Sequence, residues 1–409
     1  MNSRERLIAA LNHKEPDRVP IDFSATQMTG IMAVAYRKLR QYLGLKSDDI
    51  KIFELTQQIA VVDEDVLKRF GADVIGIRPG VPQRWKKDLL SDYSEAYFPE
   101  DYNPEIQEDG SKILRDLIGY FGYNYNLHPT LIMPKGGYYY DFAYHPLADV
   151  QDERDIDDFK WFWEIPDSDL ERIKQEINYF LNETNYGVLV NTLWGGWGQH
   201  IEVLQNLRGW DQFMVDLCLD KKLARYMMEN RFEHVLKRWE KMLGVIGDKV
   251  QIITMGDDLG LQDGPAMSPE LYREMVKPIH KKFISFIKER TKAKIWMHNC
   301  GSIYDLIPDI IELGIDVINP VQVSARNMDT KKLKKEFGKD IVFWGAGCDS
   351  QNVLPWGKPE DIREEVKRRI DDLAPGGGFV FAPIMNIQLD VPIENIIAMF
   401  EAALEYGKY

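Results

Sequence analysis

The sequence predicts an α/β fold, a (β/α)8 TIM barrel with a large inserted segment after its second strand. Three observations predict it: eight short apolar runs, amphipathic stretches between them, and a globular composition over 409 residues with 44% hydrophobic residues. The runs are rich in Val, Ile and Phe with little polar alternation, as in strands that are buried on both faces of a parallel sheet. They occupy residues 18–23, 73–77, 187–192, 250–255, 294–298, 316–321, 340–344 and 378–382.

Helix signals lie between these runs. Ser268, Pro269 and Glu270 have the residue types of an N-cap, a first helical residue and a first-turn acid. The apolar residues that follow share one helical face: Leu271, Met275, Val276, Ile279, Phe283, Ile284 and Ile287. Pro278 interrupts this stretch and is expected to kink the helix. Gly314 is expected to end the helix at 303–313.

The spacing is uneven in one place, because about 110 residues separate the second run from the third. We therefore expect one barrel over residues 1–409 with an insertion or lid at 85–180. This segment is rich in aromatic residues: Tyr120, Tyr123, Tyr125, Tyr138, Tyr139, Tyr140, Trp161 and Trp163. They form either an extra layer over the barrel mouth or the small core of the insertion itself.

Charge and hydropathy exclude several function classes. The net charge of −14 opposes binding to nucleic acid. No run of 18 uncharged apolar residues exists, so no membrane span is expected, and residues 1–6 lack the apolar run of a signal peptide. We expect a cytoplasmic protein. Three cysteines cannot form a disulfide framework, so the question is whether any of them is a ligand or nucleophile.

Catalytic groups of such barrels lie where the strands end, and a thiol and an imidazole lie there in this sequence. His298 and Cys300 end the fifth run, and Cys348 follows the seventh. We predict that these three side chains converge on zinc, with one open position for substrate. The alternative is that His298 and Cys300 are ordinary barrel residues and Cys348 a small packing residue. Cys218 lies in a helical stretch and is expected in the core.

Two adjacent carboxylates follow the fourth run. Asp257 and Asp258 should point in opposite directions, so only one of them faces the mouth. That residue is a candidate zinc ligand, hydrogen-bond acceptor from His298 or general acid, and Asp257 is assigned the catalytic role. The alternative is an acid that caps a helix or shapes the loop before Gly260.

Other residues at strand ends are predicted to bind substrate: Asp22, Trp194, Trp197, Asp258, Asn319, Gln322, Met385 and Asn386. The two tryptophans offer flat surface for a planar ligand, with core packing as the alternative. The two polar residues after the sixth run could equally make structural loop bonds.

Several motifs resemble the uroporphyrinogen decarboxylase superfamily, over nearly the whole chain. They are residues 3–6 (Ser-Arg-Glu-Arg), 16–20 (Pro-Asp-Arg-Val-Pro), 256–260 (Gly-Asp-Asp-Leu-Gly), 298–302 (His-Asn-Cys-Gly-Ser), 343–349 (Phe-Trp-Gly-Ala-Gly-Cys-Asp) and 386–388 (Asn-Ile-Gln). Within the superfamily the chain looks closer to the corrinoid-dependent methyltransferases. True decarboxylases carry an N-terminal arginine motif and an aspartate after strand 2, where this chain has residues 21–24 (Ile-Asp-Phe-Ser) and 78–80 (Arg-Pro-Gly).

The resemblance implies a zinc site made from an H-x-C pair and a distant cysteine. His298 and Cys300 match the pair, and Cys348 is the candidate third ligand. In thiol-methylating members that cysteine lies nearer the last strand, but residues 382–386 of this chain contain none.

The implied function is a zinc-dependent methyl transfer between a small methylated substrate and the cobalt of a corrinoid protein. The corrinoid (cobalamin) should arrive on a separate partner, since the chain lacks the D-x-H-x-x-G element of cobalamin-binding domains. A methoxylated aromatic substrate, and hence O-demethylation, is favoured because of the tryptophans and tyrosines. The alternatives are a uroporphyrinogen decarboxylase-type decarboxylase and a corrinoid-to-thiol methyltransferase; the resemblance also allows a homodimer.

Overall fold

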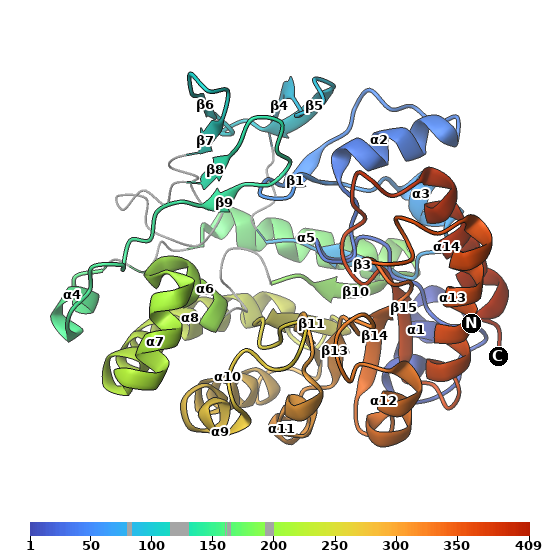
Figure 1. Cartoon of the computed structure of the whole chain (residues 1–409). Coiled ribbons are helices and arrows are strands. Elements are labelled where there is room, and N and C mark those ends of the chain that lie inside the picture. The colour runs from blue at the N-terminus through green and yellow to red at the C-terminus, as the bar shows by residue number, and fades with distance from the viewer. Residues whose placement is uncertain (80–83, 115–130, 160, 162–164, 193–199) are drawn as a thin grey trace.

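The computed structural model describes residues 1–79, 84–114, 131–159, 161, 165–192 and 200–409. A sheet of parallel strands forms its centre, with the spatial order β3, β10, β11, β12, β13, β14 and β15 (Figure 1). These strands are β3 (Val74–Ile77), β10 (Gly187–Val190), β11 (Ile252–Gly256), β12 (Lys294–His298), β13 (Val317–Asn319), β14 (Val342–Ala346) and β15 (Phe379–Ala382). They match seven of the eight predicted runs.

The remaining run, residues 18–23, closes the barrel without forming a regular strand. The Phe381 N–H donates to the carbonyl of Pro20 and the Asp22 N–H to that of Phe381, at 2.9 and 2.8 Å. On the other side, the Asp73 N–H donates to the carbonyl of Ile21 at 2.7 Å. Residues 20–22 thus join β15 to β3, and the predicted (β/α)8 barrel is confirmed. Pro20 has no N–H to give, which shortens the ladder.

The barrel interior is a packed apolar core. It contains the inward-facing side chains of the strands, among them Val74, Ile252, Trp296 and Trp344. Helix α1 (Ser3–Leu11) adds Leu7, Ala10 and Leu11 to the same cluster. This helix packs against β3, β10 and β15 and so closes one end of the barrel, leaving the opposite end for a site.

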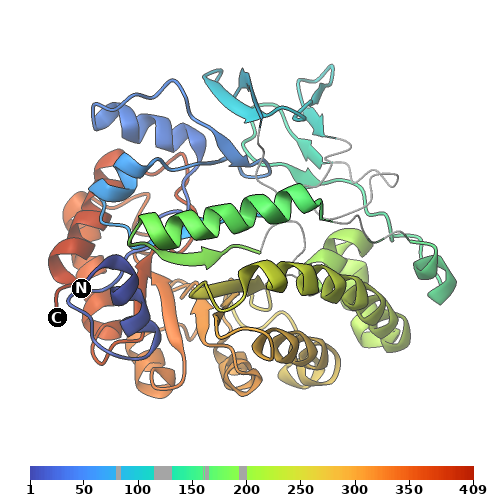
Figure 2. The ribbon, with the colours of Figure 1, turned by 180° about the vertical axis from the view of Figure 1, so that it is seen from behind.

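Helices cover the outside of the sheet (Figure 2). They are α3 (Glu64–Arg69), α5 (Asp167–Glu183), α6 (Ile201–Arg208), α7 (Trp210–Leu219), α8 (Lys221–Ile246), α9 (Pro269–Leu271), α10 (Lys277–Lys288), α11 (Ile307–Leu313), α12 (Thr330–Phe337), α13 (Pro359–Leu373) and α14 (Ile393–Tyr406). The expected kink near Pro278 takes the form of a π-helical turn, Tyr272–Val276, between α9 and α10. Gly314 ends α11 in the left-handed conformation, as expected. No helix in the described part of the chain is long and apolar enough to cross a bilayer.

Small β elements and α2 (Ala33–Tyr42) lie beside the barrel (Figure 1). The β1 (Ile52–Glu54) and β2 (Ile59–Ala60) pair precedes β3. Between β3 and β10 lie α4 (Glu153–Asp157), the hairpin of β4 (Trp85–Leu89) and β5 (Glu95–Pro99), and a sheet of β6 (Glu105–Ile106), β7 (Lys112–Leu114), β8 (Leu131–Met133) and β9 (Asp141–Phe142). The insertion after the second strand therefore exists, and its role as a lid stays a prediction.

Three tyrosines show two different roles of the aromatic residues in this insertion. The hydroxyl groups of Tyr102 and Tyr140 lie 2.9 Å apart and are buried, which is a packing role within the insertion. Tyr139 instead donates a hydrogen bond to the side chain of Gln388, in the loop that follows β15. The insertion thus has a core of its own and also contacts a loop of the barrel.

An ion-pair cluster fastens the closing segment to β3. Asp73 is fully buried, and its carboxylate accepts from Arg6 at 2.6 Å and from Arg18 at 2.7 Å. It also accepts from the backbone N–H of Ile21 at 2.9 Å. One carboxylate therefore joins α1, the closing segment and the start of the second strand.

We expect Asp73→Ala to lower the free energy of unfolding by about 3–5 kcal/mol, because Arg6, Arg18 and the Ile21 N–H lose a fully buried carboxylate and only Arg6 keeps a second one, Asp17. Urea unfolding measures this change. The control is Asp371→Ala, which breaks an exposed pair with Lys367 and should cost less than about 1 kcal/mol. Equal costs for the two variants would contradict the structural role of Asp73.

Candidate metal centre at the barrel mouth

The register of β11 and β12 brings the predicted site residues together. These strands are parallel, and Gly256 lies beside His298. The residues just past this pair are therefore neighbours, and the Cys300 N–H donates to the Asp258 carboxylate at 2.9 Å. Both strands end at the mouth, where catalytic groups of such barrels lie.

Asp258, His298 and Cys300 form a group that could hold a metal ion. One ligand atom from each lies within 4.8 Å of the others. The His298 Nε2 atom is 3.3 Å from the Cys300 Sγ atom and 3.7 Å from the Asp258 Oδ1 atom. A nitrogen, a sulfur and an oxygen donor thus point at one small volume, a donor set that suits zinc.

Asn319 sets the orientation of the His298 ring. Its side-chain Oδ1 atom lies 2.9 Å from the His298 Nδ1 atom, and its Nδ2 atom donates to the Trp344 carbonyl at 3.1 Å. That second bond fixes which end of the amide faces His298. The Nδ1 atom must therefore carry the proton, which leaves the Nε2 lone pair directed at Cys300 and Asp258. Asn319 was predicted to bind substrate; the structure places it behind the imidazole instead.

The thiol of Cys300 lies in an environment that disfavours its anion. Burial and the neighbouring charge of Asp258 raise its pKa well above the usual range. Two acidic groups held this close repel each other once ionised, and a divalent cation between them would remove that repulsion. The electrostatics of the described residues therefore fit a metal ion.

Asp257 faces away from this group. Its carboxylate accepts the backbone N–H groups of His200, Ile201 and Glu202 at 2.7–2.9 Å and also contacts His280 at 2.8 Å. It is fully buried at the start of α6. Asp257 thus has the helix-capping role that the sequence analysis gave as the alternative to catalysis. Its neighbour Asp258 is the carboxylate that reaches the mouth.

Cys348 is not part of the group formed by the described residues. Its thiol is 1% exposed within the main hydrophobic core. Burial raises its pKa, and the charges that act on it include Glu365 and Arg369 from α13. The thiol therefore lies toward the outer helices, in the packing position that the sequence offered as the alternative. Cys218 is exposed on α7, so its expected core position is wrong.

The comparisons with known proteins bear on the family and the fold. Residues 205–406 match the family model described as uroporphyrinogen decarboxylase (URO-D). The carboxyl-terminal half of this chain belongs to the uroporphyrinogen decarboxylase family. The match contains β11 to β15, and therefore all three residues of the candidate metal group. The predicted superfamily is confirmed. A search of curated protein sequences found no match.

A solved structure shares the fold of this chain over nearly its whole length. A methyltransferase from Methanosarcina mazei is similar over 99% of each chain, with a TM-score of 0.58 and 17% identity. The match to an endo-glycoceramidase II from Rhodococcus sp. covers 57% of this chain and 65% of that chain, with 8% identity and a TM-score of 0.35. The match to a glycoside hydrolase family 5 enzyme from Prevotella bryantii covers 59% of this chain and 77% of that chain, with 12% identity and a TM-score of 0.33. The first similarity supports the barrel over the full chain.

Met385 lies in the loop after β15, close to the candidate metal group. Its Sδ atom lies 3.7 Å from the Cys300 Sγ atom. The next residue, Asn386, donates to Gln57 and accepts from Gln388. Met385 therefore borders the metal group, whereas the amide of Asn386 is used to hold the loop after β15.

The remaining predicted substrate residues have mixed placements. Gln322 accepts from the Gly301 N–H at 2.7 Å and donates to Gln262, so it makes the structural loop bonds that were the alternative. Asp22 is buried and accepts from Trp344 Nε1 at 2.9 Å. Trp194 and Trp197 lie outside the described residues.

Besides Asp257, the described residues include the buried carboxyl groups of Asp22 and Glu54, of which only Asp22 was identified from the sequence. Burial raises the pKa of Asp22 to about 6 and that of Glu54 to about 7. Glu54 accepts from the backbone N–H groups of Thr56 and Gln57 at 2.8 and 2.7 Å. Because Gln57 also binds Asn386, Glu54 is linked to the loop after β15. Glu54 does not lie at the end of a predicted strand, so the sequence did not identify it.

We expect Glu54 to remain protonated up to about pH 7, because its raised pKa favours the neutral acid. Difference infrared spectroscopy should show the carbonyl band of a carboxylic acid growing as the pH falls from 8 to 6. Glu54→Gln should remove this component and leave the one that titrates near pH 6, which belongs to Asp22. Glu95→Gln, at an exposed position, should leave the Glu54 and Asp22 components unchanged. If both components persist in Glu54→Gln, the assignment to Glu54 is wrong.

Proposed function

We propose that this chain is a zinc-dependent methyltransferase that moves a methyl group between a small methylated substrate and a separate corrinoid protein. One observation carries the proposal: Asp258, His298 and Cys300 converge at the mouth of a uroporphyrinogen decarboxylase family barrel. The structural similarity to a methyltransferase over 99% of each chain supports the fold that this chemistry needs.

The donor set differs from the one predicted from sequence. Asp258 takes the third position in place of Cys348, so the proposed ligands are one thiolate, one carboxylate and one neutral imidazole. The two negative charges balance a divalent ion. Three protein ligands and one open position are typical of catalytic zinc sites.

Zinc bound there would supply a Lewis acid that stabilises negative charge on an oxygen or sulfur atom of the substrate. In O-demethylation, the methyl group leaves the ether oxygen, which keeps the electron pair of the broken bond. The chain contributes the orientation of the residues that would hold the metal. Asn319 holds His298, and Asp258 accepts from the backbone of Cys300, so the ligands need little rearrangement.

A methoxylated aromatic compound remains the favoured substrate. The described mouth has Tyr139 hydrogen-bonded to Gln388, beside the loop that carries Met385. The same loop borders the proposed ligands through Met385, whose Sδ atom lies 3.7 Å from the Cys300 Sγ atom, and this link supports an aromatic substrate. The corrinoid partner would approach the same end of the barrel, because α1 closes the other end.

We expect zinc to bind with about one ion per chain and to be lost in His298→Ala, which removes a donor, and in Cys300→Ser and Asp258→Asn, which replace an anionic donor by a weaker neutral one. Metal analysis of purified variants measures this. Cys348→Ser and Cys218→Ser are the matched controls and should keep the metal. Loss of zinc in Cys348→Ser, together with retention of zinc in Asp258→Asn, would instead support the ligands predicted from the sequence: His298, Cys300 and Cys348.

The activity is tested by mixing the zinc-loaded protein with a reduced corrinoid protein and a panel of methyl donors while following the cobalt absorbance. Methylation of cobalt by methoxyarenes alone supports the favoured substrate. Methylation only with a thiol acceptor present supports the thiol-methylating alternative. Carbon dioxide release from uroporphyrinogen without a corrinoid protein would overturn the proposal in favour of a decarboxylase.

We expect Asn319→Leu to weaken zinc binding by about 10–100-fold, because the ring of His298 loses the acceptor that fixes its tautomer. Competition with a chromogenic chelator measures the affinity. Asn352→Leu removes an amide that contacts only the Asp349 loop and is the control. Unchanged affinity in Asn319→Leu would show that the metal does not use His298 Nε2.

A further inference from the structure

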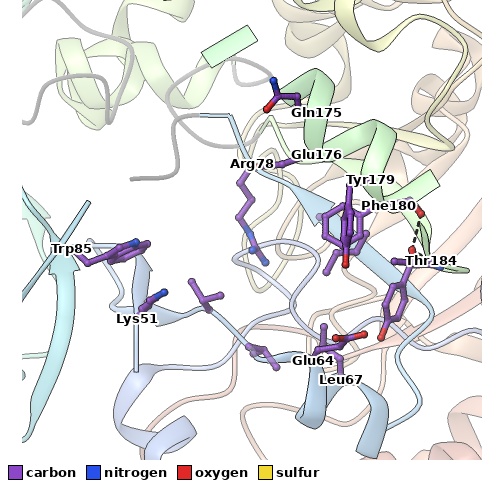
Figure 3. Close-up of a pocket in the computed structure, with 15 residues that line it drawn as sticks. Lys51, Glu64, Leu67, Arg78, Trp85, Gln175, Glu176, Tyr179, Phe180 and Thr184 are labelled. Carbon is purple, nitrogen blue, oxygen red and sulfur yellow. Dashed lines mark hydrogen bonds between the residues drawn. The ribbon is translucent and has the colours of Figure 1, made fainter. Parts of the chain in front are cut away.

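A cavity of about 700 Å³ lies in the side of the barrel, away from the candidate metal centre. It is bounded by α3, α5, the outer side of β3 and the first residue of β4 (Figure 3). In the sheet, β10 and β11 separate β3 from β12, which carries His298. The cavity is therefore a distinct place in the fold, and the proposed methyl transfer does not use it.

The walls of this side cavity are mainly apolar and include several aromatic rings. Aliphatic side chains of β3, α3 and the segment after β2 form the floor, and aromatic rings form two facing sides. The aromatic members are Trp85, Tyr179, Phe180 and Tyr186. Figure 3 shows Trp85 on one side of the cavity and Tyr179 and Phe180 on the opposite side. Rings on opposite sides favour a flat apolar ligand.

Two cationic side chains reach the cavity without an ion-pair partner among the described residues. The Lys51 ammonium lies 5.7 Å from the centre of the Trp85 ring. The Arg78 guanidinium lies 4.0 Å above the Phe53 ring and donates to the carbonyl of Ser24. The Arg78 Nε atom is buried with no hydrogen-bond partner in the described part of the chain. Such an orphaned donor is costly unless a ligand or water satisfies it.

Each of the two carboxylates that line the cavity already has a cationic partner, although the charge of Glu176 also acts on Arg78. Glu64 pairs with Lys68 at 2.9 Å, and Glu176 pairs with Arg172 at 2.7 Å. Lys68 and Arg172 themselves do not line the cavity. The charge left without a partner is therefore positive, even though the chain as a whole carries −14.

We propose that this side cavity binds an organic anion with a flat apolar body, such as an aromatic carboxylate. The carboxylate would accept from Arg78 and Lys51, and the ring would lie between Trp85 and Tyr179. Charge-assisted hydrogen bonds to a carboxylate are about twice as strong as neutral ones, so charge should decide the selectivity.

Fluorine NMR with three matched probes tests the proposal: para-trifluoromethylbenzoate, the corresponding benzamide and the corresponding benzylammonium ion. The benzoate should bind about tenfold more tightly than the amide. Lys51→Gln should reduce benzoate affinity about tenfold, and Trp85→Ala should reduce the affinity of both benzoate and amide. Both positions are outside the core, so these variants should fold.

The controls separate this cavity from the mouth and from general charge effects. Lys87→Gln, on the same hairpin as Trp85, should leave benzoate binding unchanged, as should Cys300→Ser. Lys51→Gln should keep its zinc. Equal binding of benzoate and amide, a preference for the ammonium probe, or benzoate binding that is lost in Cys300→Ser but kept in Lys51→Gln would overturn the proposal.

Discussion

The parallel pairing of β11 with β12 is the constraint on which the candidate site depends. Backbone hydrogen bonds fix Gly256 beside His298, and everything past this pair follows from that register. Asp258 then meets the backbone of Cys300, and β13 adds Asn319 beside His298. A slip of one residue would turn each of these side chains to the other face of the sheet. The positions of the site residues thus follow from the strand register, and the packed barrel core disfavours any other register.

Much of the barrel and part of the site could be predicted, because both depend on local pattern. Strands buried on both faces show as apolar runs, and strand ends in a barrel locate the mouth. His298 and Cys300 were identified this way, since alternation along an extended segment places both on one side. Cys348 was placed at the mouth only because it follows the end of the seventh run, and that rule was not sufficient. Gly345 and Ala346 have positive φ angles of 120° and 54°, so the chain turns before Cys348 and alternation no longer applies.

Other features depend on contacts between distant segments, which residue spacing does not reveal. The role of Asn319 requires its amide to be held by Trp344 on a third strand. The raised pKa of Glu54 requires burial by segments that come together only in the folded chain. The side cavity requires α3 and α5 to lie apart over β3. None of these has a motif, and each is a property of the assembled barrel.

Asp257 and Asp258 show why one strand end can serve both scaffold and chemistry. Successive side chains past β11 point in opposite directions, so the carboxylate of Asp257 holds the start of α6 while that of Asp258 faces His298. Asp257 offsets its burial with several N–H donors and His280, and it holds the start of the helix in place. Asp258 is partly exposed, and among the described residues its role is defined by Cys300 and His298. Adjacent residues therefore have two separate roles: Asp257 holds the start of α6, a helix that precedes β11 in the chain, and Asp258 remains available for a ligand.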